Sequence, residues 1–125
     1  MIKVTKHIEP RPTPRPMITR WGGAIYPKWY PEYRTIWAKE WEKFDKIPAD
    51  NWVKIQIHCE YQMPKSLKGR KYPFPKHDVD NLAKAILDSM NKVLFHDDTQ
   101  VVSLKVTKDY YVDNKVSVKV QYGKD

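Results

Sequence analysis

Four aspartates stand in two close pairs within residues 77–100, HDVDNLAKAILDSMNKVLFHDDTQ. Asp78 and Asp80 are separated by one residue, and Asp97 and Asp98 are adjacent. This segment holds five acidic and two basic residues, although the whole chain has 23 basic and 15 acidic residues. Two carboxylates about 4 Å apart repel each other by roughly 4 kcal/mol at an effective dielectric near 20, so a convergent cluster requires a cation.

Carboxylate oxygens are the ligands that Mg²⁺ or Mn²⁺ prefers, with water and phosphate completing the coordination. Such a metal activates water and stabilises a phosphate during hydrolysis. The two pairs converge only if the chain after Asp98 runs back along the intervening helix, which the sequence leaves open. For His77 and His96, a flanking polar role is favoured over metal ligation. An EF-hand loop is excluded, because Ala83 and Ser89 stand where it needs Gly and Glu.

The first pair stands at the start of a predicted helix, VDNLAKAILDSMNKV. A stripe at helical spacing predicts the side that packs on the core: Leu82, Ile86, Ser89, Met90 and Val93. Asp80, Lys84 and Asp88 recur every four residues on the opposite side. A solvated face of Asp–Lys pairs, with Asp78 as the N-cap, is the simpler explanation. The Asp-x-Asp spacing and the later Asp-Asp pair favour a functional site instead.

The elements that must position this helix follow from hydrophobic periodicity. Alternating residues predict strands, and aromatic residues at spacings of three and four predict a further helix. The predicted order is a strand in 2–9, a helix in 31–47, a strand in 51–62, the acidic helix, and a hairpin of 101–112 and 115–123. This order predicts an α+β fold, in which a small mixed or antiparallel sheet carries two main helices. At 125 residues, we expect one domain spanning 1–125.

Two segments without acidic residues carry the excess positive charge, one from Pro10 through Pro31 and one from Tyr61 to His77. The first is too rich in proline for a regular helix and alternates arginines with aromatic residues, which suits phosphate contact and base stacking. The second is a predicted loop dense in Lys and Arg. The candidate DNA contacts are Arg11, Arg15, Arg20, Lys68, Arg70, Lys71 and Lys76. A Pro-rich edge segment and a solvated loop without a partner are the alternatives.

The composition limits the cellular setting and the partner. A pI near 9.5 favours a polyanion, nucleic acid before membrane. No apolar run approaches the roughly 18 residues of a membrane span, and the N-terminus lacks the apolar region of a signal peptide. Cys59 is the one cysteine, so an intramolecular disulfide is excluded and a buried structural thiol is expected. We therefore expect a cytoplasmic protein without membrane contact.

The acidic stretch resembles a known family, the RusA Holliday-junction resolvases. DVDNLAKAILDSMN, followed by DDTQV and Lys108, matches their Asp-x-Asp-Asn, the Lys four residues later and the subsequent Asp-Asp-Ser/Thr-Gln. The Arg-Pro-rich start before an aromatic helix is similar more loosely. Family members often carry a basic residue or Pro before the first Asp, where this chain has His77.

The resemblance implies a homodimeric, Mg²⁺-dependent endonuclease that nicks four-way DNA junctions symmetrically in recombination and repair, with Mn²⁺ as a substitute. It implies metal binding by Asp78, Asp80 and Asp98 and a catalytic role at the scissile phosphate for Lys84. Asp88 also matches a recurrent family position. Asp97 either orients its neighbour or binds metal itself. Compact members are often prophage-encoded, which favours a phage-derived gene.

Three other functions remain open at this point. One is a nuclease for flaps or other branched DNA. Another is a non-catalytic DNA-binding module, whose aspartates only cap and solvate a helix. A third is an interaction protein with a basic surface and no nucleic-acid role.

Overall fold

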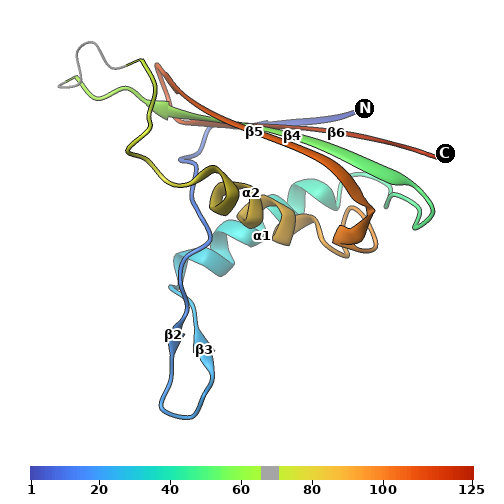
Figure 1. Cartoon of the computed structure of the whole chain (residues 1–125), viewed down its shortest axis with the longest axis horizontal. Coiled ribbons are helices and arrows are strands. Elements are labelled where there is room, and N and C mark those ends of the chain that lie inside the picture. The colour runs from blue at the N-terminus through green and yellow to red at the C-terminus, as the bar shows by residue number, and fades with distance from the viewer. Residues whose placement is uncertain (66–70) are drawn as a thin grey trace.

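The computed structural model describes residues 1–65 and 71–125. In chain order the elements are β1 (Ile2–Lys6), β2 (Met17–Ile18), β3 (Ala24–Ile25), α1 (Trp29–Trp41), β4 (Trp52–Gln62), α2 (Val79–Met90), the short 3-10 helix η1 (Asp98–Gln100), β5 (Val101–Tyr111) and β6 (Lys115–Gly123). Figure 1 shows α1 and α2 packed against one face of the sheet, while β2 and β3 project away from it. The predicted α+β class is confirmed. None of the helices in the described ranges combines the length and apolar character needed to cross a membrane.

The sheet is mixed, and β4 lies inside it in the order β1-β6-β4-β5. β4 runs parallel to β5 and antiparallel to β6. Every second residue of β4 from Val53 to Tyr61 is buried. This apolar side faces the helices, and a central position protects both edges of the strand from water.

The two final strands differ from the predicted hairpin, although their order along the chain is as expected. β5 and β6 each pair with β4, which lies between them. Residues 112–114 therefore cross the end of β4, a span of about 10 Å for two strand spacings. The Gln62 backbone N–H donates to Asn114 Oδ1 at 2.9 Å, which closes that end of β4. A two-residue turn is too short for this crossing. Asp113-Asn114 therefore correctly predicted a turn, but not that this turn connects two strands separated by β4.

Aromatic packing joins the two helices. Trp37 and Trp41 have 0% exposure, and their rings stack with centroids 5.7 Å apart. Trp41 Nε1 donates to Ser89 Oγ in α2 at 2.9 Å, so the polar member of the predicted apolar stripe is satisfied. Leu82 and Ile86 of that stripe are also buried. The core face predicted for the acidic helix is confirmed for the four stripe residues inside α2, whereas Val93 lies beyond its end and is partly buried.

Cys59 lies in β4 as a free, buried cysteine. Burial raises the pKa of its thiol to about 12, so the sulfur stays protonated near neutral pH. The prediction of a buried thiol is confirmed.

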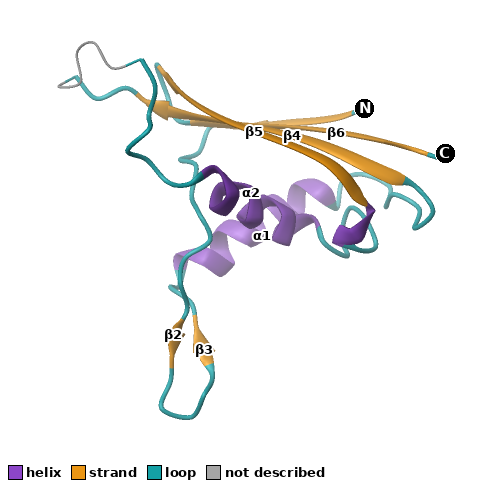
Figure 2. Ribbon diagram, in the orientation of Figure 1, coloured by secondary structure: helices purple, strands orange, loops and turns teal. Residues whose placement is uncertain are grey.

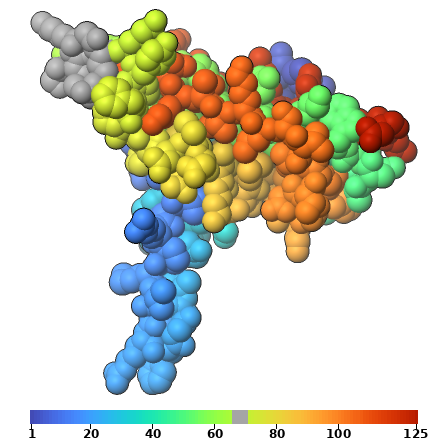
Figure 3. Space-filling view, viewed as in Figure 1, coloured from blue at the N-terminus to red at the C-terminus, as the bar shows by residue number. Residues whose placement is uncertain are grey.

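The Pro-rich segment ends in a two-stranded arm, residues 17–25, where the sequence predicted only an irregular loop. β2 and β3 pair antiparallel. The Thr19 N–H donates to the Gly23 carbonyl at 2.7 Å, and the Gly22 N–H donates to the Thr19 carbonyl at 3.0 Å. Gly22 has φ +83°, a conformation that glycine adopts without steric cost. Figure 3 shows the arm standing clear of the body of the molecule.

Trp41→Ala should destabilise the fold by about 3–5 kcal/mol, because it opens a cavity and removes the hydrogen bond to Ser89. Urea unfolding followed by circular dichroism measures this loss. Trp41→Phe should cost less, since it keeps an aromatic ring in the core. Lys39→Met, at an exposed position of α1, should stay within about 0.5 kcal/mol of wild type. An unchanged unfolding midpoint for Trp41→Ala would contradict the packing described here.

Candidate functional site

Asp78 and Asp80 lie at the beginning of α2 with exposed side chains. Asp78 occupies the N-cap position at φ −64° and ψ 139°, but its side chain makes no capping hydrogen bond. The Asp80 carboxylate accepts a hydrogen bond from the Asn81 backbone N–H at 3.0 Å, through one of its two oxygens. Asp78 therefore does not cap the helix through its side chain, as the simpler explanation requires. Both carboxylates keep oxygens available for a ligand.

Lys84 lies one helical turn after Asp80 and is exposed. Within residues 1–65 and 71–125, Lys84 forms no ion pair with either neighbouring aspartate. The described residues therefore do not form the Asp–Lys ion pairs expected if this side of the helix were only a solvent-exposed surface. Asp88 instead accepts a hydrogen bond from the Tyr30 hydroxyl at 2.8 Å. Burial raises the pKa of Tyr30 and the Asp88 carboxylate adds to the rise, so Asp88 serves to join α2 to α1.

The beginning of α2 is fastened to the sheet by Lys108 of β5. Lys108 Nζ donates to the carbonyl oxygens of Lys76 at 3.1 Å and His77 at 2.9 Å. The His77 ring adds a contact, with Nδ1 3.3 Å from the Tyr61 hydroxyl. Partial burial, reinforced by the charge of Lys76, lowers the pKa of His77. His77 therefore supports the loop before Asp78 as a neutral ring.

The second acidic pair lies in the turn that precedes β5. Asp97 Oδ2 accepts a hydrogen bond from Thr99 Oγ1 at 2.7 Å, which lowers the pKa of Asp97. Gln100 Oε1 accepts the backbone N–H of Asp97 at 3.1 Å, and its Nε2 donates to the Pro48 carbonyl at 2.9 Å. These contacts build the turn and attach it to the segment before β4. The exposed Asp98 is accordingly the member of the pair better placed to bind a ligand.

The two acidic pairs lie at opposite ends of α2. Lys108 of β5 contacts the residues just before α2, whereas Asp97 and Asp98 follow the end of α2 and stand just before the start of β5. The strand from Val101 to Lys108 spans roughly 23 Å at 3.3 Å per residue. Figure 2 shows the start of α2 and the short helix before β5 well apart. In the described part of the chain, no three His, Cys, Asp or Glu side chains are grouped to hold a metal ion. A single chain therefore does not bring Asp98 to Asp78.

The predicted DNA contacts fall into three groups. Arg15 and Arg20 are exposed in and beside the arm. Arg11 is engaged locally, because its guanidinium lies 4.9 Å from the centroid of the Trp29 ring and 3.6 Å from Glu9. The remaining two described contacts, Lys71 and Lys76, are exposed before α2, each over a tyrosine ring. Lys68 and Arg70 lie outside the described residues.

The lead-in to the arm docks on the first turn of α2. The Thr13 N–H and hydroxyl both donate to the Asn81 carbonyl, at 3.1 Å and 3.4 Å. Further back, the Arg11 N–H donates to the Tyr33 hydroxyl oxygen at 3.4 Å. The segment that leads to the exposed arginines is thereby attached to the first turn of α2, which contains Asp80. Sequence reasoning missed this contact, since nothing local marks Thr13 as a partner of α2.

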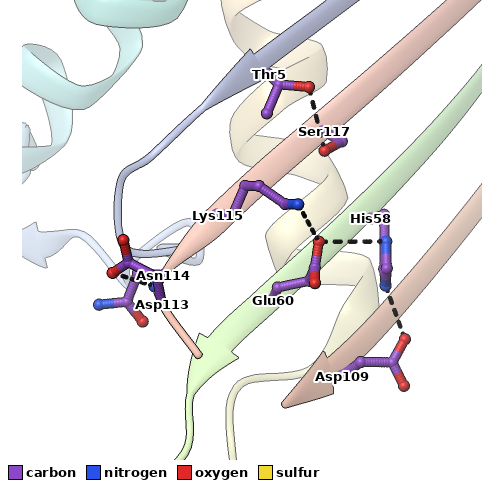
Figure 4. Close-up of polar contacts among 8 residues, drawn as sticks. All are labelled: Thr5, His58, Glu60, Asp109, Asp113, Asn114, Lys115 and Ser117. Atoms are coloured by element: carbon purple, nitrogen blue, oxygen red, sulfur yellow. Dashed lines mark hydrogen bonds and ion pairs between the residues drawn. The ribbon is translucent and has the colours of Figure 1, made fainter. Parts of the chain in front are cut away.

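The open face of the sheet carries a separate polar network, shown in Figure 4. His58 Nε2 lies 2.7 Å from Asp109 Oδ2, and Glu60 Oε1 lies 3.3 Å from Lys115 Nζ. These side chains line a cavity of about 490 Å³. Glu60 and Lys115 form an ion pair there, and none of the predicted site residues lines the cavity.

Lys108→Met should loosen the loop before Asp78, because two backbone carbonyls lose their charged donor. Hydrogen exchange followed by mass spectrometry should show faster exchange in peptides covering residues 71–82, with β4 unaffected. Lys105→Met on the same strand is the matched control and should leave that exchange unchanged. Equal protection of these peptides in both variants would rule out the anchoring role.

The chain is similar to known proteins. The family model described as endodeoxyribonuclease RusA matches residues 7–121. The chain is also similar to the "Uncharacterized protein YqaN" of Bacillus subtilis (strain 168), with 29% identity over 137 residues, 96% of this chain and 95% of that protein. The name of that relative states no activity, whereas the family description supports a nuclease. Matched over nearly its whole length, the chain belongs to the RusA endodeoxyribonuclease family.

Proposed function

We propose that this protein is a cytoplasmic, Mg²⁺-dependent, homodimeric endonuclease that resolves four-way DNA junctions by paired nicks in recombination and repair. The observation that carries the proposal is the exposed start of α2. There, Asp78 at the N-cap position precedes Asp80 and Lys84, which share one side of the helix, in a chain of an endodeoxyribonuclease family. Lys84 forms no ion pair within the described residues. The segment that leads into the arginine-bearing arm is hydrogen-bonded to the same first turn of α2.

The donor set fits the metal that the proposal requires. Asp78, Asp80 and Asp98 offer exposed carboxylate oxygens, the donors that Mg²⁺ prefers and Mn²⁺ also accepts. When bound, the metal supplies an activated water and neutralises charge on the phosphate. Asp97 is committed to its turn and would support Asp98 rather than bind metal.

Lys84 would hold the scissile phosphate through a charge-assisted hydrogen bond, one turn from Asp80. A carboxylate cluster by itself repels a phosphodiester. The basic residues around it must therefore hold the polyanion, and each phosphate contact releases counterions. The residues proposed for this grip are Arg11, Arg15, Arg20, Lys68, Arg70, Lys71 and Lys76.

A second chain is needed to complete the site, and the edge of β5 is the surface proposed for it. β5 is an edge strand of 11 residues. Val102 and Leu104 on it are 63% and 43% exposed. Long edge strands that expose apolar side chains invite pairing with another chain. An isologous contact about a twofold axis would cover both copies with the same residues.

The register of this pairing follows from the apolar residues. Antiparallel pairing of two β5 strands centred on Ser103 places Val102 directly opposite Leu104 of the partner subunit. The exposed apolar side chains then cover each other. One continuous sheet results, with both helix layers on the same face.

The same register brings Asp98 of the partner subunit to the level of Lys108, which fastens the loop before Asp78. Two α2 helices would lie side by side and antiparallel, so the start of one meets the end of the other. Each metal site then contains Asp78 and Asp80 from one chain and Asp98 of the partner subunit. This arrangement accounts for the separation of the two pairs within one chain.

Two such sites related by a twofold axis match a substrate of the same symmetry. A four-way junction presents two equivalent strands to a symmetric dimer, whereas a flap presents one. The symmetry therefore favours the junction over other branched DNA as substrate. The absent capping bond of Asp78 also weighs against a non-catalytic module.

Wild-type protein should nick a synthetic four-way junction in Mg²⁺ or Mn²⁺ and leave it intact in EDTA. Lys84→Met should slow cleavage by on the order of 10²-fold through lost charge stabilisation, and Asp80→Asn by at least as much. Denaturing gels of end-labelled strands measure both rates, with Lys39→Met as the charge-matched control. Junction binding without any cutting would establish the non-catalytic module. Faster cutting of flaps than of junctions would establish the rival nuclease.

Mixing two inactive variants tests whether the site spans two chains. Asp80→Asn and Asp98→Asn are each inactive alone, but their heterodimer has one intact site in the proposed arrangement. After random subunit exchange, we expect roughly a quarter of wild-type nicking, mostly in single strands. A mixture of Asp78→Asn with Asp80→Asn is the control and should regain nothing. Absence of rescue in the first mixture, with heterodimers verified by mass spectrometry, would refute the shared site.

A further inference from the structure

The tip of the arm presents an aromatic side chain to solvent. Trp21 is 88% exposed, and it follows Arg20 in the turn closed by Thr19 and Gly22. The Arg20 guanidinium lies 5.7 Å from the centroid of the Trp21 ring. Figures 1 and 3 show that this turn is the part of the arm farthest from the sheet.

The rest of the arm is apolar as well. Met17 and Ile18 on β2 are 71% and 77% exposed, and Ile25 on β3 is 54% exposed. A two-stranded ribbon with both faces in water is marginally stable by itself. Apolar surface of this kind, gathered on a projecting element, marks an interaction site.

The charge around the arm selects the chemistry of its partner. No acidic residue occurs from Pro10 through Pro31, and Arg15 and Arg20 are exposed within that stretch. An arginine beside an exposed tryptophan provides a cation for a phosphate and a flat ring for a base. A polyanion with accessible aromatic rings, namely nucleic acid with unstacked bases, satisfies both groups.

The base of the arm lies beside the proposed metal ligands. Thr13 is hydrogen-bonded to Asn81, the residue after Asp80. From Pro16 to Trp21 the chain extends by up to roughly 17 Å at 3.3 Å per residue. DNA held at the start of α2 is therefore within reach of the tip.

We propose that Trp21 stacks on a base left unpaired or unstacked at the branch of the DNA substrate, with Arg20 on the adjoining phosphate. The proposal rests on the proposed function, because it places branched DNA at the start of α2. It goes further by assigning the distinction between branched and linear DNA to the arm. In linear duplex every base is already stacked on its neighbours, so Trp21 gains no new contact there.

Binding measured without cleavage tests this role. Asp80→Asn serves as the background, in EDTA, with a four-way junction that carries 2-aminopurine at a branch nucleotide and with a linear duplex of the same sequence. Adding Trp21→Ala should weaken junction binding about tenfold, since stacking on one base is worth roughly 1–3 kcal/mol. Duplex binding should change less than twofold, and the change in 2-aminopurine fluorescence should disappear. Trp21→Phe should retain most of both signals.

Val112→Ala is the matched control, because it removes a similarly exposed apolar side chain, 79% against 88% for Trp21, at a position outside the arm. It should leave junction affinity and fluorescence near those of the background. Equal losses for junction and duplex with Trp21→Ala would overturn the proposal and make the arm a general DNA clamp. A changed oligomeric state in sedimentation would overturn it in favour of an arm that grips the partner chain. If the background protein binds no junction, the proposed function itself fails, whereas binding that is insensitive to Trp21 refutes only the stacking role.

Discussion

The burial of one side of α2 between α1 and the sheet is the interaction on which the rest of the structure depends. Leu82, Ile86 and Met90 are almost completely buried, and each contributes about 1.5–3 kcal/mol. Rotating the helix would expose them and break the hydrogen bond between Trp41 and Ser89. The packing therefore determines which side of α2 faces solvent. The burial of the apolar residues therefore sets the direction in which Asp80 and Lys84 point.

The same helix keeps the two acidic pairs apart, at a length of roughly 18 Å for 12 residues. In one chain the carboxylates therefore do not repel each other across a cluster. Their convergence in the proposed dimer would require a cation, as two like charges at contact distance do. Dimer assembly and metal binding would then depend on each other, because the clustered carboxylates repel one another until a cation binds. The monomer would fold without this repulsion.

Exposed basic residues of the chain lie on the two segments that adjoin the start of α2. The Pro-rich segment cannot form a helix, so it crosses the first turn of α2 as extended chain and continues into the arm. The loop before α2 adds the exposed Lys71 and Lys76. In the proposed function, these basic residues would hold the polyanion while its backbone lies against the carboxylates. By contrast, the charges on the open face of the sheet are largely paired with one another.

The sequence by itself determined the class of fold, the core face of α2 and the family, because hydrophobic periodicity and the spacing of the aspartates are local patterns. It also indicated Asp80, Lys84 and Asp88 as neighbours on one helix side, since helical geometry sets that relation, and it placed Asp78 at the N-cap. Only the tertiary structure decided that β4 separates β5 from β6, that Lys108 fastens the start of α2, and that Asp98 lies at its far end. These relations join residues distant along the chain. They depend on strand order and direction, which no local pattern encodes.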